Sequence, residues 1–473
     1  MNRPPKWPLR ILRWFCPLEL LEEIEGDLYE QFSRDIDKYG YSASRRKFAW
    51  NAVRFIRPGI VRRNTVNSKF GFMVMFASNL RVATRVILRN KVVSAFSIVG
   101  LIMGLASALL MGLWLHNEYS FDSYHKDLDR MYQIYNQQDV EGSTVTWSHT
   151  PRILSPTLKE TYSFVEYSAS YASYGEEFIF NVNDKIVLSD QGIFTDPDYL
   201  KIFTFDFLAG SAETALNEPN SIILTRSFAR LLFGTENILG NEVSIQSQGY
   251  TFDLEITGVV DDLPANTDFS FEYLIGFRFL ENLFGKDENW NNNSVQTYLK
   301  LKPGTDAVEA NDQLRELVKI HTKAENEPDL LLYPFKRTHL YGAFENGHEA
   351  GGRIEIIRIL TILAISLVLI ACINFINIST ARAQKRSREI GIRKTIGAQK
   401  WSLTTQFLFE SELMVFIAGI GALLVAAYAL PWFNSLIDQQ LTFPWDSPLF
   451  WILILVVCVL TGLLAGIYPA LFL

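Results

Sequence analysis

Four long apolar stretches dominate the pattern of hydrophobic and polar positions along this chain. A membrane-spanning helix needs ~20 mostly apolar residues. A buried helix of a soluble protein would explain one such stretch but not four. We therefore predict four transmembrane helices. The stretches run over Val92–Leu115, Ile354–Ile378, Phe407–Leu430 and Leu449–Phe472.

The region between the first two stretches, residues 117–353, has the mixed pattern of an α/β domain. Alternating or aromatic-rich runs predict strands, and apolar residues at helical spacing predict helices. The predicted strands cover 177–182, 185–188, 252–260 and 297–301. The predicted helices cover 225–233 and 307–324, the second with Val308, Leu314, Leu317 and Ile320 on its buried side. All three cysteines lie outside this region, so we expect it to fold without disulfides.

The residues that precede the first apolar stretch predict a small helical module. Over 19–39, apolar residues recur every three or four positions and Gly40 follows as a stop. A second helix is expected to begin after Ser42 or Ser44 and to end at Pro58-Gly59. From Phe72 to Arg89, an apolar stripe faces a row of arginines, which predicts an amphipathic helix in the plane of the membrane interface.

Composition and charge predict which side of the membrane each segment lies on. The chain of 473 residues is 48% hydrophobic with a net charge of −7, but this average conceals opposed blocks. Residues 1–91 carry a net charge of +10, residues 117–353 carry −19 and residues 381–400 carry +6. Short basic flanks stay in the cytoplasm. We therefore expect a multi-pass membrane protein, with its N-terminus in the cytoplasm and the α/β domain outside.

These patterns divide the chain into nine predicted parts. They are a cytoplasmic prefix module (1–66), an elbow helix (67–91), transmembrane helix 1 (92–116), an extracytoplasmic domain (117–353), transmembrane helix 2 (354–378), a cytoplasmic segment (379–406), transmembrane helix 3 (407–430), an outer loop (431–448) and transmembrane helix 4 (449–472). The fold class is thus a multi-pass α-helical membrane protein with a mixed α/β extracytoplasmic domain.

The motifs of common enzymes are absent from the sequence. No G-x-x-x-x-G-K-[ST] loop occurs to cradle ATP phosphates. The six histidines lack zinc-site spacing, and no G-x-S-x-G elbow is present. We therefore expect no catalytic residue, no metal site and no cofactor in this chain. The basic residues of the prefix module favour a membrane surface or a protein partner over nucleic acid, because the anionic inner leaflet lies close by.

Small residues in the first apolar stretch predict close helix packing. Gly100 and Gly104 have the small-xxx-small spacing that lets a second helix approach. Two interpretations remain open at this point: ordinary packing within one bundle, or a seam between two copies. Asn374 and Asn377, near the inner end of the second stretch, would need hydrogen-bond partners in hydrocarbon.

The strongest motif follows the second stretch. The segment Arg388-Glu-Ile-Gly-Ile-Arg-Lys-Thr-Ile-Gly-Ala398, with Gln406-Phe-Leu-Phe-Glu410, resembles the signature of MacB/FtsX-type ABC transporter permeases. Further similar segments are Asp129-Arg-Met-Tyr132, Asp196-Pro-Asp-Tyr-Leu-Lys-Ile-Phe203, Ile256-Thr-Gly-Val-Val-Asp-Asp-Leu-Pro264 and Gly462-Leu-Leu-Ala-Gly-Ile-Tyr-Pro469. The first residues resemble the helical prefix module found on some permeases of this family.

The resemblance implies a subunit that does no chemistry of its own. A separate cytoplasmic ABC ATPase would bind ATP and dock on the segment after the second helix, and its strokes would move the extracytoplasmic domain for export or for release of a lipoprotein or lipid-type substrate. The ATPase-coupling residues implied by the resemblance are Arg388, Glu389, Ile390, Gly391, Arg393, Lys394 and Gly397. The implied partners are this ATPase, the lipid bilayer, a periplasmic adaptor, and either a second permease copy or a missing C-terminal half.

Two alternatives share the same architecture. One is an FtsX-like regulator of a cell-wall hydrolase, and the other is a membrane-anchored receptor for an extracytoplasmic ligand. The uncharged end of the fourth stretch at Ala470–Leu473 lacks the basic flank expected inside the cell. We therefore expect this sequence to be the N-terminal half of a longer permease.

Overall fold

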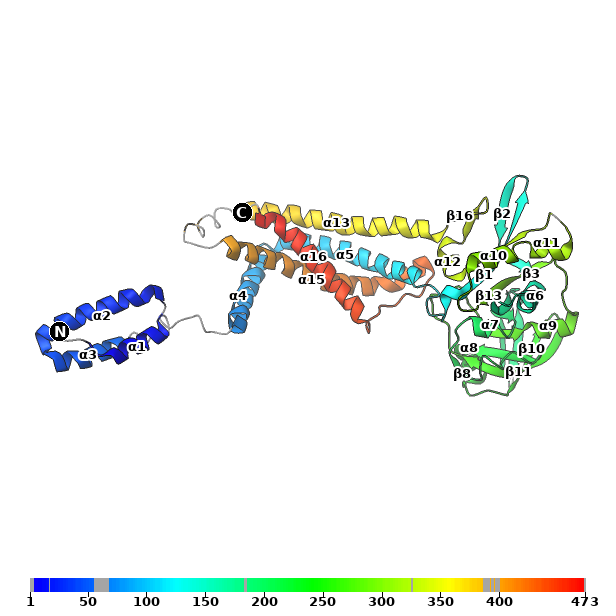
Figure 1. The fold of residues 1–473 in the computed structure, drawn as a ribbon, viewed down its shortest axis with the longest axis horizontal. Helices are drawn as coiled ribbons and strands as arrows, with labels where there is room; N and C mark the ends of the chain where they lie inside the picture. Colours follow the sequence, from blue (N-terminus) through cyan, green and yellow to red (C-terminus); the bar gives the residue numbers. More distant parts are fainter. Residues whose placement is uncertain are drawn as a thin grey trace. The chain divides into compact units, whose positions relative to one another are not determined.

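A computed structural model describes residues 4–16, 18–54, 68–182, 185–324, 326–385, 392, 395 and 400–471. The chain forms two compact units, coloured along the sequence in Figure 1. One comprises residues 1–91 with 398–413, and the other comprises 92–397 with 414–473.

The first unit begins with a bundle of the helices α1 (Lys6–Phe15), α2 (Leu18–Tyr39) and α3 (Tyr41–Arg54). The predicted helix over 19–39 is confirmed, and Gly40, with φ +73°, makes the turn into α3. α1 was not predicted, because its apolar run is interrupted by Arg10 and Arg13. These arginines are exposed while Leu9 and Leu12 are buried, so the interruption is the polar face of an amphipathic helix.

The elbow helix and the membrane helices follow. α4 (Ser68–Arg89) confirms that a helix precedes the first span, and its place in the membrane interface stays a prediction. Within the described residues, four helices are long and apolar enough to cross a bilayer, as predicted. They are α5 (Lys91–Tyr119), α13 (Arg353–Lys385), α15 (Lys400–Ile437) and α16 (Pro448–Leu471). α13 and α15 extend past their apolar stretches, because polar residues that flank a membrane span can continue the same backbone hydrogen bonding in water.

Both predicted packing glycines face α13. A Cβ atom added at Gly104 would lie 2.6 Å from Cβ of Ala371, and one added at Gly100 would lie 3.0 Å from Nδ2 of Asn374. Two helices can approach this closely only where one of them has no side chain. The glycines thus serve packing between α5 and α13 of the same chain.

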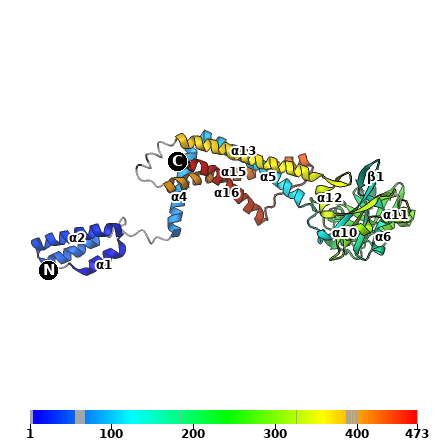
Figure 2. The ribbon, with the colours of Figure 1, turned by 45° about the horizontal axis from the view of Figure 1, so that its top comes forward.

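The second unit places a mixed α/β domain between α5 and α13, at one end of the helices (Figures 1 and 2). The strands of its main sheet follow the order β14-β1-β13-β4-β7-β12-β9-β11-β10-β5-β6. β2 pairs with β1, β3 with β13 and β8 with β11, while β15 and β16 form a separate hairpin. Most neighbours are antiparallel, but β9 runs parallel to β11 and β7 parallel to β12.

The strands of this domain are β1 (Met131–Val140), β2 (Ser143–Trp147), β3 (His149–Pro151), β4 (Val165–Ala172), β5 (Phe178–Val182), β6 (Lys185–Ser189), β7 (Gly192–Thr195), β8 (Phe207–Ala209), β9 (Ser221–Thr225), β10 (Glu242–Ser247), β11 (Tyr250–Val260), β12 (Tyr273–Gly276), β13 (Asn293–Leu301), β14 (Asp329–Pro334), β15 (Ala343–Glu345) and β16 (His348–Gly351). Its helices are the 3-10 turn η2 (Leu128–Arg130), α6 (Leu154–Thr161), α7 (Tyr199–Ile202), α8 (Arg226–Phe233), α9 (Phe277–Phe284), α10 (Ala307–Leu314), α11 (Leu317–Thr322) and α12 (Phe335–Tyr341). The four predicted strands and the helix predicted over 225–233 are confirmed.

The single helix predicted over 307–324 is wrong. The structure has two helices there, α10 and α11, with a break at Arg315-Glu316. Leu314 and Leu317 are buried as predicted, but Val308 and Ile320 are 71% and 64% exposed. Ala310 and Val318 are buried instead, in one cluster with residues of β13 and β14. Helical spacing alone cannot reveal such a break when neither Gly nor Pro marks it.

An aromatic core lies where this domain meets the membrane helices. The His125 ring packs against Phe203, Phe269 and Phe335. Its Nδ1 accepts a hydrogen bond of 3.1 Å from the Thr204 backbone N–H. Burial lowers the pKa of His125 to about 4, so the ring is neutral at physiological pH.

Asp122 is the polar neighbour of this core. Its φ of +55° is a left-handed conformation, and its Oδ1 accepts hydrogen bonds from the Thr267 hydroxyl and the Asp268 N–H. Burial raises the pKa of Asp122 to about 7. Asp122 and His125 therefore shift in opposite directions, both because burial disfavours a charge.

We predict that alanine at Gly104 destabilises the helix pair, whereas alanine at Gly112 does not. The new Cβ of Gly104→Ala would overlap Ala371, at a cost of about 1–3 kcal/mol. No described atom lies within 4 Å of a Cβ at Gly112, so Gly112→Ala should gain up to about 1 kcal/mol from helix propensity. Thermal unfolding of the detergent-solubilised chain measures both. Equal effects of the two substitutions would contradict the packing assignment.

We predict that Asp122→Asn changes the pH dependence of stability. Folded Asp122 keeps its proton up to pH about 7, whereas an unfolded Asp releases it near ~4. The wild type therefore loses stability from this group as pH rises through that window, by at most ~1.4 kcal/mol per pH unit. Asn removes this loss and tolerates the left-handed backbone. The stability of the variant minus that of the wild type should therefore rise between pH 4.5 and 7, as measured by thermal unfolding. A difference in stability that does not change with pH would contradict this prediction.

Candidate functional site

Polar side chains from several segments meet where the membrane helices join the extracellular domain. All of these segments belong to the second compact unit. Glu118 lies in the last turn of α5, and Arg353 is the first residue of α13. His339 lies on α12, and Gln439 follows the end of α15. Asp268 comes from the loop between β11 and β12. We call Glu118, His339, Asp268, Arg353 and Gln439 the junction cluster.

Glu118 is the centre of the junction cluster. Its side chain is 0% exposed. Its Oε2 lies 2.8 Å from Nε2 of His339, and its Oε1 accepts a hydrogen bond of 3.0 Å from Nε2 of Gln439. Nη1 of Arg353 lies 3.4 Å from each of the two oxygens. A buried carboxylate is tolerated only when it is paired and hydrogen-bonded in this way.

His339 connects Glu118 to the extracellular domain. Its Nδ1 lies 3.2 Å from Oδ1 of Asp268, and its ring stacks on Phe121 with 3.5 Å between centroids. Burial lowers the pKa of His339, but hydrogen bonds to Asp268 and Glu118 and their charges raise it by more, so the net direction is upward. A protonated ring can donate to both carboxylates at once, so the imidazolium form suits this position.

The loop after α15 is held against α5 by amide side chains. Gln439 Oε1 accepts a hydrogen bond of 3.3 Å from Nδ2 of Asn117, next to the bond that its Nε2 makes to Glu118. Asn434 closes the loop on itself, because its side chain donates to Leu441 O at 2.9 Å and accepts from Leu441 N at 3.2 Å. The outer ends of α5, α13 and α15 are therefore tied together through one carboxylate.

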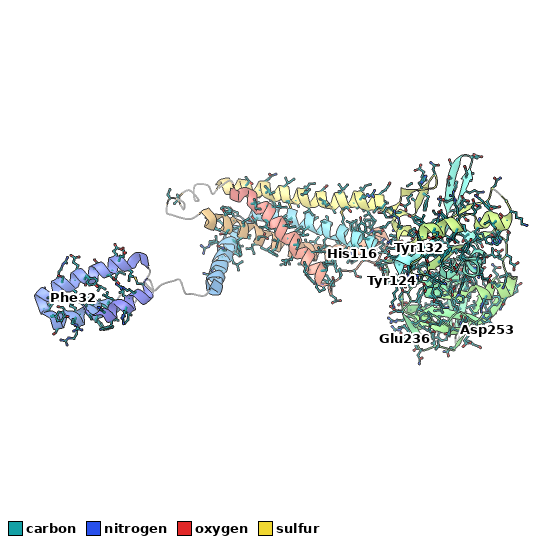
Figure 3. The ribbon with its side chains drawn as sticks, in the orientation of Figure 1. Phe32, His116, Tyr124, Tyr132, Glu236 and Asp253 are labelled. Atoms are coloured by element: carbon teal, nitrogen blue, oxygen red, sulfur yellow. The ribbon has the colours of Figure 1, made fainter. Side chains whose placement is uncertain are left out.

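A second set of bonds fixes the end of α5 to the loop between β11 and β12. Asn266 Nδ2 donates to Ser120 O at 2.9 Å, and the Asp122 N–H donates to Asn266 O at 2.9 Å. Tyr124, labelled in Figure 3 together with His116 of α5, lies at this end of the domain. Because side-chain and backbone bonds both span the contact, α5 cannot shift at its outer end without moving this loop.

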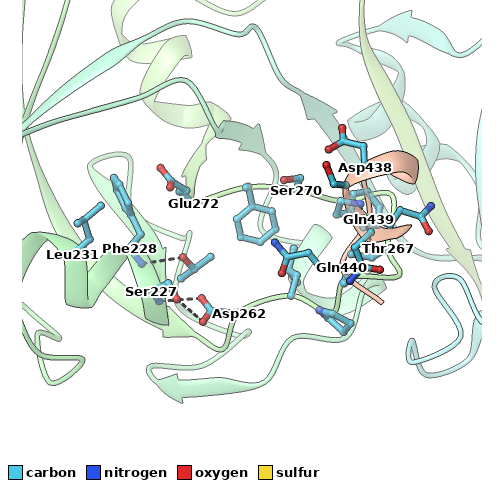
Figure 4. A pocket seen from close by; sticks show the side chains of 18 residues that line it. Ser227, Phe228, Leu231, Asp262, Thr267, Ser270, Glu272, Asp438, Gln439 and Gln440 are labelled. Carbon is cyan, nitrogen blue, oxygen red and sulfur yellow. Dashed lines mark hydrogen bonds between the residues drawn. The ribbon is translucent and has the colours of Figure 1, made fainter. Parts of the chain in front are cut away.

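An open cavity of about 910 Å³ borders the junction cluster at Gln439. One wall comes from α8 and the loop after β11, and the other comes from the loop after α15, including Asp438 and Gln439 (Figure 4). Asp262 on the first wall accepts hydrogen bonds from the Ser227 N–H at 2.9 Å and the Ser227 hydroxyl at 2.7 Å. Of the junction cluster, Gln439 alone is among the residues that line this cavity.

The residues that sequence reasoning selected divide into two groups. Gly100 and Gly104 lie at the contact of α5 with α13. The coupling residues implied by the resemblance, Arg388, Glu389, Ile390, Gly391, Arg393, Lys394 and Gly397, lie outside the described residues. No described group of three or more His, Cys, Asp or Glu side chains could hold a metal ion.

Sequence reasoning missed the junction cluster. His339 has no motif around it, and its neighbours Glu118 and Asp268 are distant in sequence. One signal was available, because Glu118 lies three residues after the long apolar run that ends at Leu115. A charged residue at that position requires a partner, although the sequence does not identify which one.

Family models match two parts of this chain. Residues 94–317 match the MacB-like periplasmic core domain, and residues 361–473 match the FtsX-like permease C-terminal region. The first model includes most of α5 and most of the α/β domain, and the second includes most of α13 and all of α15.

Relatives are found among ABC transporter proteins. The ABC transporter permease YknZ of Bacillus subtilis is 26% identical over 67% of this chain and 70% of its own length. The macrolide export ATP-binding/permease protein MacB of Escherichia coli is 22% identical over 86% of this chain and 60% of its own length. The crystal structure of the periplasmic region of MacB from Actinobacillus actinomycetemcomitans is 15% identical, with a TM-score of 0.32 over 43% of this chain and 88% of that one.

The chain spans less than two thirds of the length of MacB. The matched regions nevertheless follow the order seen in the structure, with the extracellular domain between the first and second membrane helices and the FtsX-like region after it. With both family regions, four candidate membrane helices and similarity to YknZ and MacB, this chain belongs to the MacB/FtsX-type ABC transporter permeases.

Proposed function

We propose that this permease transmits the strokes of a separate cytoplasmic ABC ATPase to its extracellular domain. ATP would bind to the ATPase, and this chain would contribute no cofactor. The moving domain would drive export, or the release of a lipoprotein or lipid-type substrate, outside the membrane. The chain would lie in the bacterial inner membrane with its N-terminus in the cytoplasm.

The observation that carries this proposal is the buried Glu118. It lies at the outer end of the continuous helix α5 and bonds Arg353 at the outer end of the continuous helix α13. α5 has 29 residues and α13 has 33, which correspond to about 44 and 50 Å of helix. A rigid helix moves as one body, so a displacement at its inner end reaches its outer end. The junction cluster ties both outer ends to the domain.

Charge supports the proposed orientation. Arg81, Arg85, Arg89 and Lys91 precede the first span, and the segment 381–400 with a net charge of +6 follows the second. Basic flanks of this kind resist translocation. The same basic segment would carry the ATPase contact, with Arg388, Glu389, Ile390, Gly391, Arg393, Lys394 and Gly397 as the contact or turn residues.

A second permease unit is the remaining proposed partner within the membrane. Large apolar side chains on α5 and α13 are exposed in the single chain, among them Phe96, Met103, Ile359 and Ile362. Lipid or another helix can cover such a surface. A second copy of this chain, or a C-terminal half, would fit there, and a periplasmic adaptor would contact the extracellular domain.

We predict that Glu389→Lys weakens binding of the ATPase. Reversing a charge within a contact leaves its partner charge unpaired, which should lower recovery by at least about tenfold. The measurement is pull-down of the tagged, detergent-solubilised chain from its native host, with the captured ABC ATPase quantified by mass spectrometry. Glu288→Lys is the matched control, because it makes the same change on an exposed site of the extracellular domain. Failure of the wild type to recover any ABC ATPase would refute the coupling role.

We predict that His339→Ala uncouples the domain from the helices without releasing the ATPase. The substitution removes His339 as a partner of the buried Glu118 carboxylate, which should lower the free energy of unfolding by about 3 kcal/mol. Spin labels at Lys286→Cys and Asp446→Cys report the distance between domain and outer loop, and the described native cysteines are buried. In the wild-type complex this distance should change on ATP addition, and in His339→Ala it should not.

Arg337→Ala is the matched control for this experiment. Arg337 lies on the same helix, α12, but pairs with Glu349 rather than with Glu118. It should keep the ATP-dependent change in distance. If His339→Ala and Arg337→Ala behave alike, the junction cluster does not transmit the movement. If the domain moves and a cell-wall hydrolase is what crosslinks to it, the output of the stroke is regulation of that enzyme instead of transport.

A further inference from the structure

The prefix module has its own hydrophobic core. Leu12, Leu28, Phe32 and Phe48 are buried between α1, α2 and α3, and Figure 3 shows Phe32 within the bundle. Ion pairs join α1 and α3 to α2: Arg13 bonds Glu25 at 2.6 Å and Lys47 bonds Asp35 at 2.7 Å. These contacts hold α2 against α1 and α3. The charged side chains of α2 therefore lie on a different part of the module's surface from those of α1 and α3.

The charges of the module are segregated by helix. All eight acidic residues of 1–66 lie on α2, which has a net charge of −6. α1 and α3 together contain seven Lys and Arg residues and no acidic residue. Among the described residues, no carboxylate pairs with Lys6, Arg10, Arg46 or Arg54. The module therefore has one acidic helix and two basic helices, and most cations of the basic helices have no carboxylate partner among the described side chains.

The basic helices also expose aromatic and aliphatic side chains. Trp7 on α1 and Trp50 on α3 are 54% and 66% exposed, and Ile11 and Val53 on the same two helices are exposed as well. On α3, Arg46, Trp50 and Val53 recur at spacings of four and three, on the side opposite the buried Phe48. On α1, Trp7, Arg10 and Ile11 lie opposite the buried Leu9 and Leu12. We call these exposed sides of α1 and α3 together the outer face: Trp7, Arg10, Ile11, Arg46, Trp50 and Val53.

We propose that the outer face of the prefix module docks on the anionic surface of the lipid bilayer. Tryptophan prefers the membrane–water interface, where its ring is half in apolar surroundings and its N–H reaches water. Lys and Arg beside such anchors are attracted to anionic headgroups. The acidic α2 would be repelled by the same headgroups, so the module can dock in only one orientation.

The position of the module in the chain favours a bilayer over a protein partner. Thirteen residues, 55–67, separate α3 from α4; at full extension they reach at most about 45 Å. This connection contains Arg57, Arg62 and Arg63 and no acidic residue. α4 leads, after Asn90 alone, into the membrane helix α5. A module held this close to the membrane needs only weak affinity to remain docked, because the tether supplies a high effective concentration.

This inference does not depend on the proposed ATPase partner. A lipid-docked module would hold the N-terminal end of α4 near the headgroups whether or not ATP is being hydrolysed. It assigns a role to the part of the chain that precedes both matched family regions. The docking would respond to the lipid composition and salt concentration, as electrostatic attachment to membranes does.

A fluorescent label on the outer face tests the proposal in the full chain. Val53→Cys labelled with nitrobenzoxadiazole is reconstituted into nanodiscs of phosphatidylcholine, with or without about 30 mol% phosphatidylglycerol. The described native cysteines are buried and should not compete for the label. We expect a blue shift and quenching by doxyl-labelled lipid in the anionic nanodiscs only. The same label at Glu23→Cys, on exposed α2, should show neither change.

Variants that change the charge of the module provide a second test of the proposal. Arg10→Glu and Arg46→Glu should each lower the ratio of docked to free module by at least about fivefold, because each removes one cation near the headgroups. Lys38→Glu on α2 makes the same change in charge away from the outer face and should have no effect. Trp7→Ala with Trp50→Ala should reduce quenching by doxyl lipid. Far-UV circular dichroism verifies that each variant is folded.

Three results would overturn the proposal. The first is the same emission from Val53→Cys in neutral and anionic nanodiscs. The second is equal quenching of the labels at Val53→Cys and Glu23→Cys. The third is shielding of the outer-face label only after a cytoplasmic protein is added, whatever the lipid, which would assign the face to a protein partner.

Discussion

The burial of one carboxylate governs the architecture of the second unit. Glu118 ends a membrane helix and is sealed from solvent, so its charge must be met by protein groups. His339, Arg353 and Gln439 meet it, and they come from three different segments of the chain. Each segment leads into or out of a different part of the fold: α12 follows the sheet, Arg353 starts α13 and Gln439 leaves α15. A single electrostatic requirement therefore fixes how the outer ends of the helices converge on the domain.

On the membrane side of the junction cluster, the packing of α5 on α13 depends on the small size of the side chains rather than on charge. Gly104 lets the backbone of α5 approach Ala371 of α13, and no polar bond is needed to hold the contact. Above it, the aromatic core around His125 gives the domain a firm base next to the membrane helices. The junction thus lies between two well-packed regions, and a cavity borders it at Gln439. Because the outer ends of α5, α13 and α15 share the bonds of Glu118, we expect a displacement of one of them to disturb the other two.

The charge of the chain has a different meaning in each region. The net charge of −7 is the remainder of a basic N-terminal part, an acidic extracellular part and a basic segment after α13. Within the prefix module the same segregation recurs on a smaller scale, with acids on α2 and bases on α1 and α3. At both scales the basic groups are those expected to lie near anionic lipid, which the positive-inside rule and headgroup attraction both favour.

The sequence alone determined the four spans, the mixed α/β class of the domain, four of its strands and the family, because these depend on local periodicity, on segment charge and on the motif around Arg388–Ala398. It did not reveal the helical break at Arg315-Glu316, since no Gly or Pro marks it. It also left Gly100 and Gly104 undecided between two kinds of packing. Only the tertiary structure identified α13 as their neighbour and assembled Glu118 with His339, which are 221 residues apart. Local patterns record which residues avoid water, but a buried charge finds its partners through the folded arrangement of distant segments.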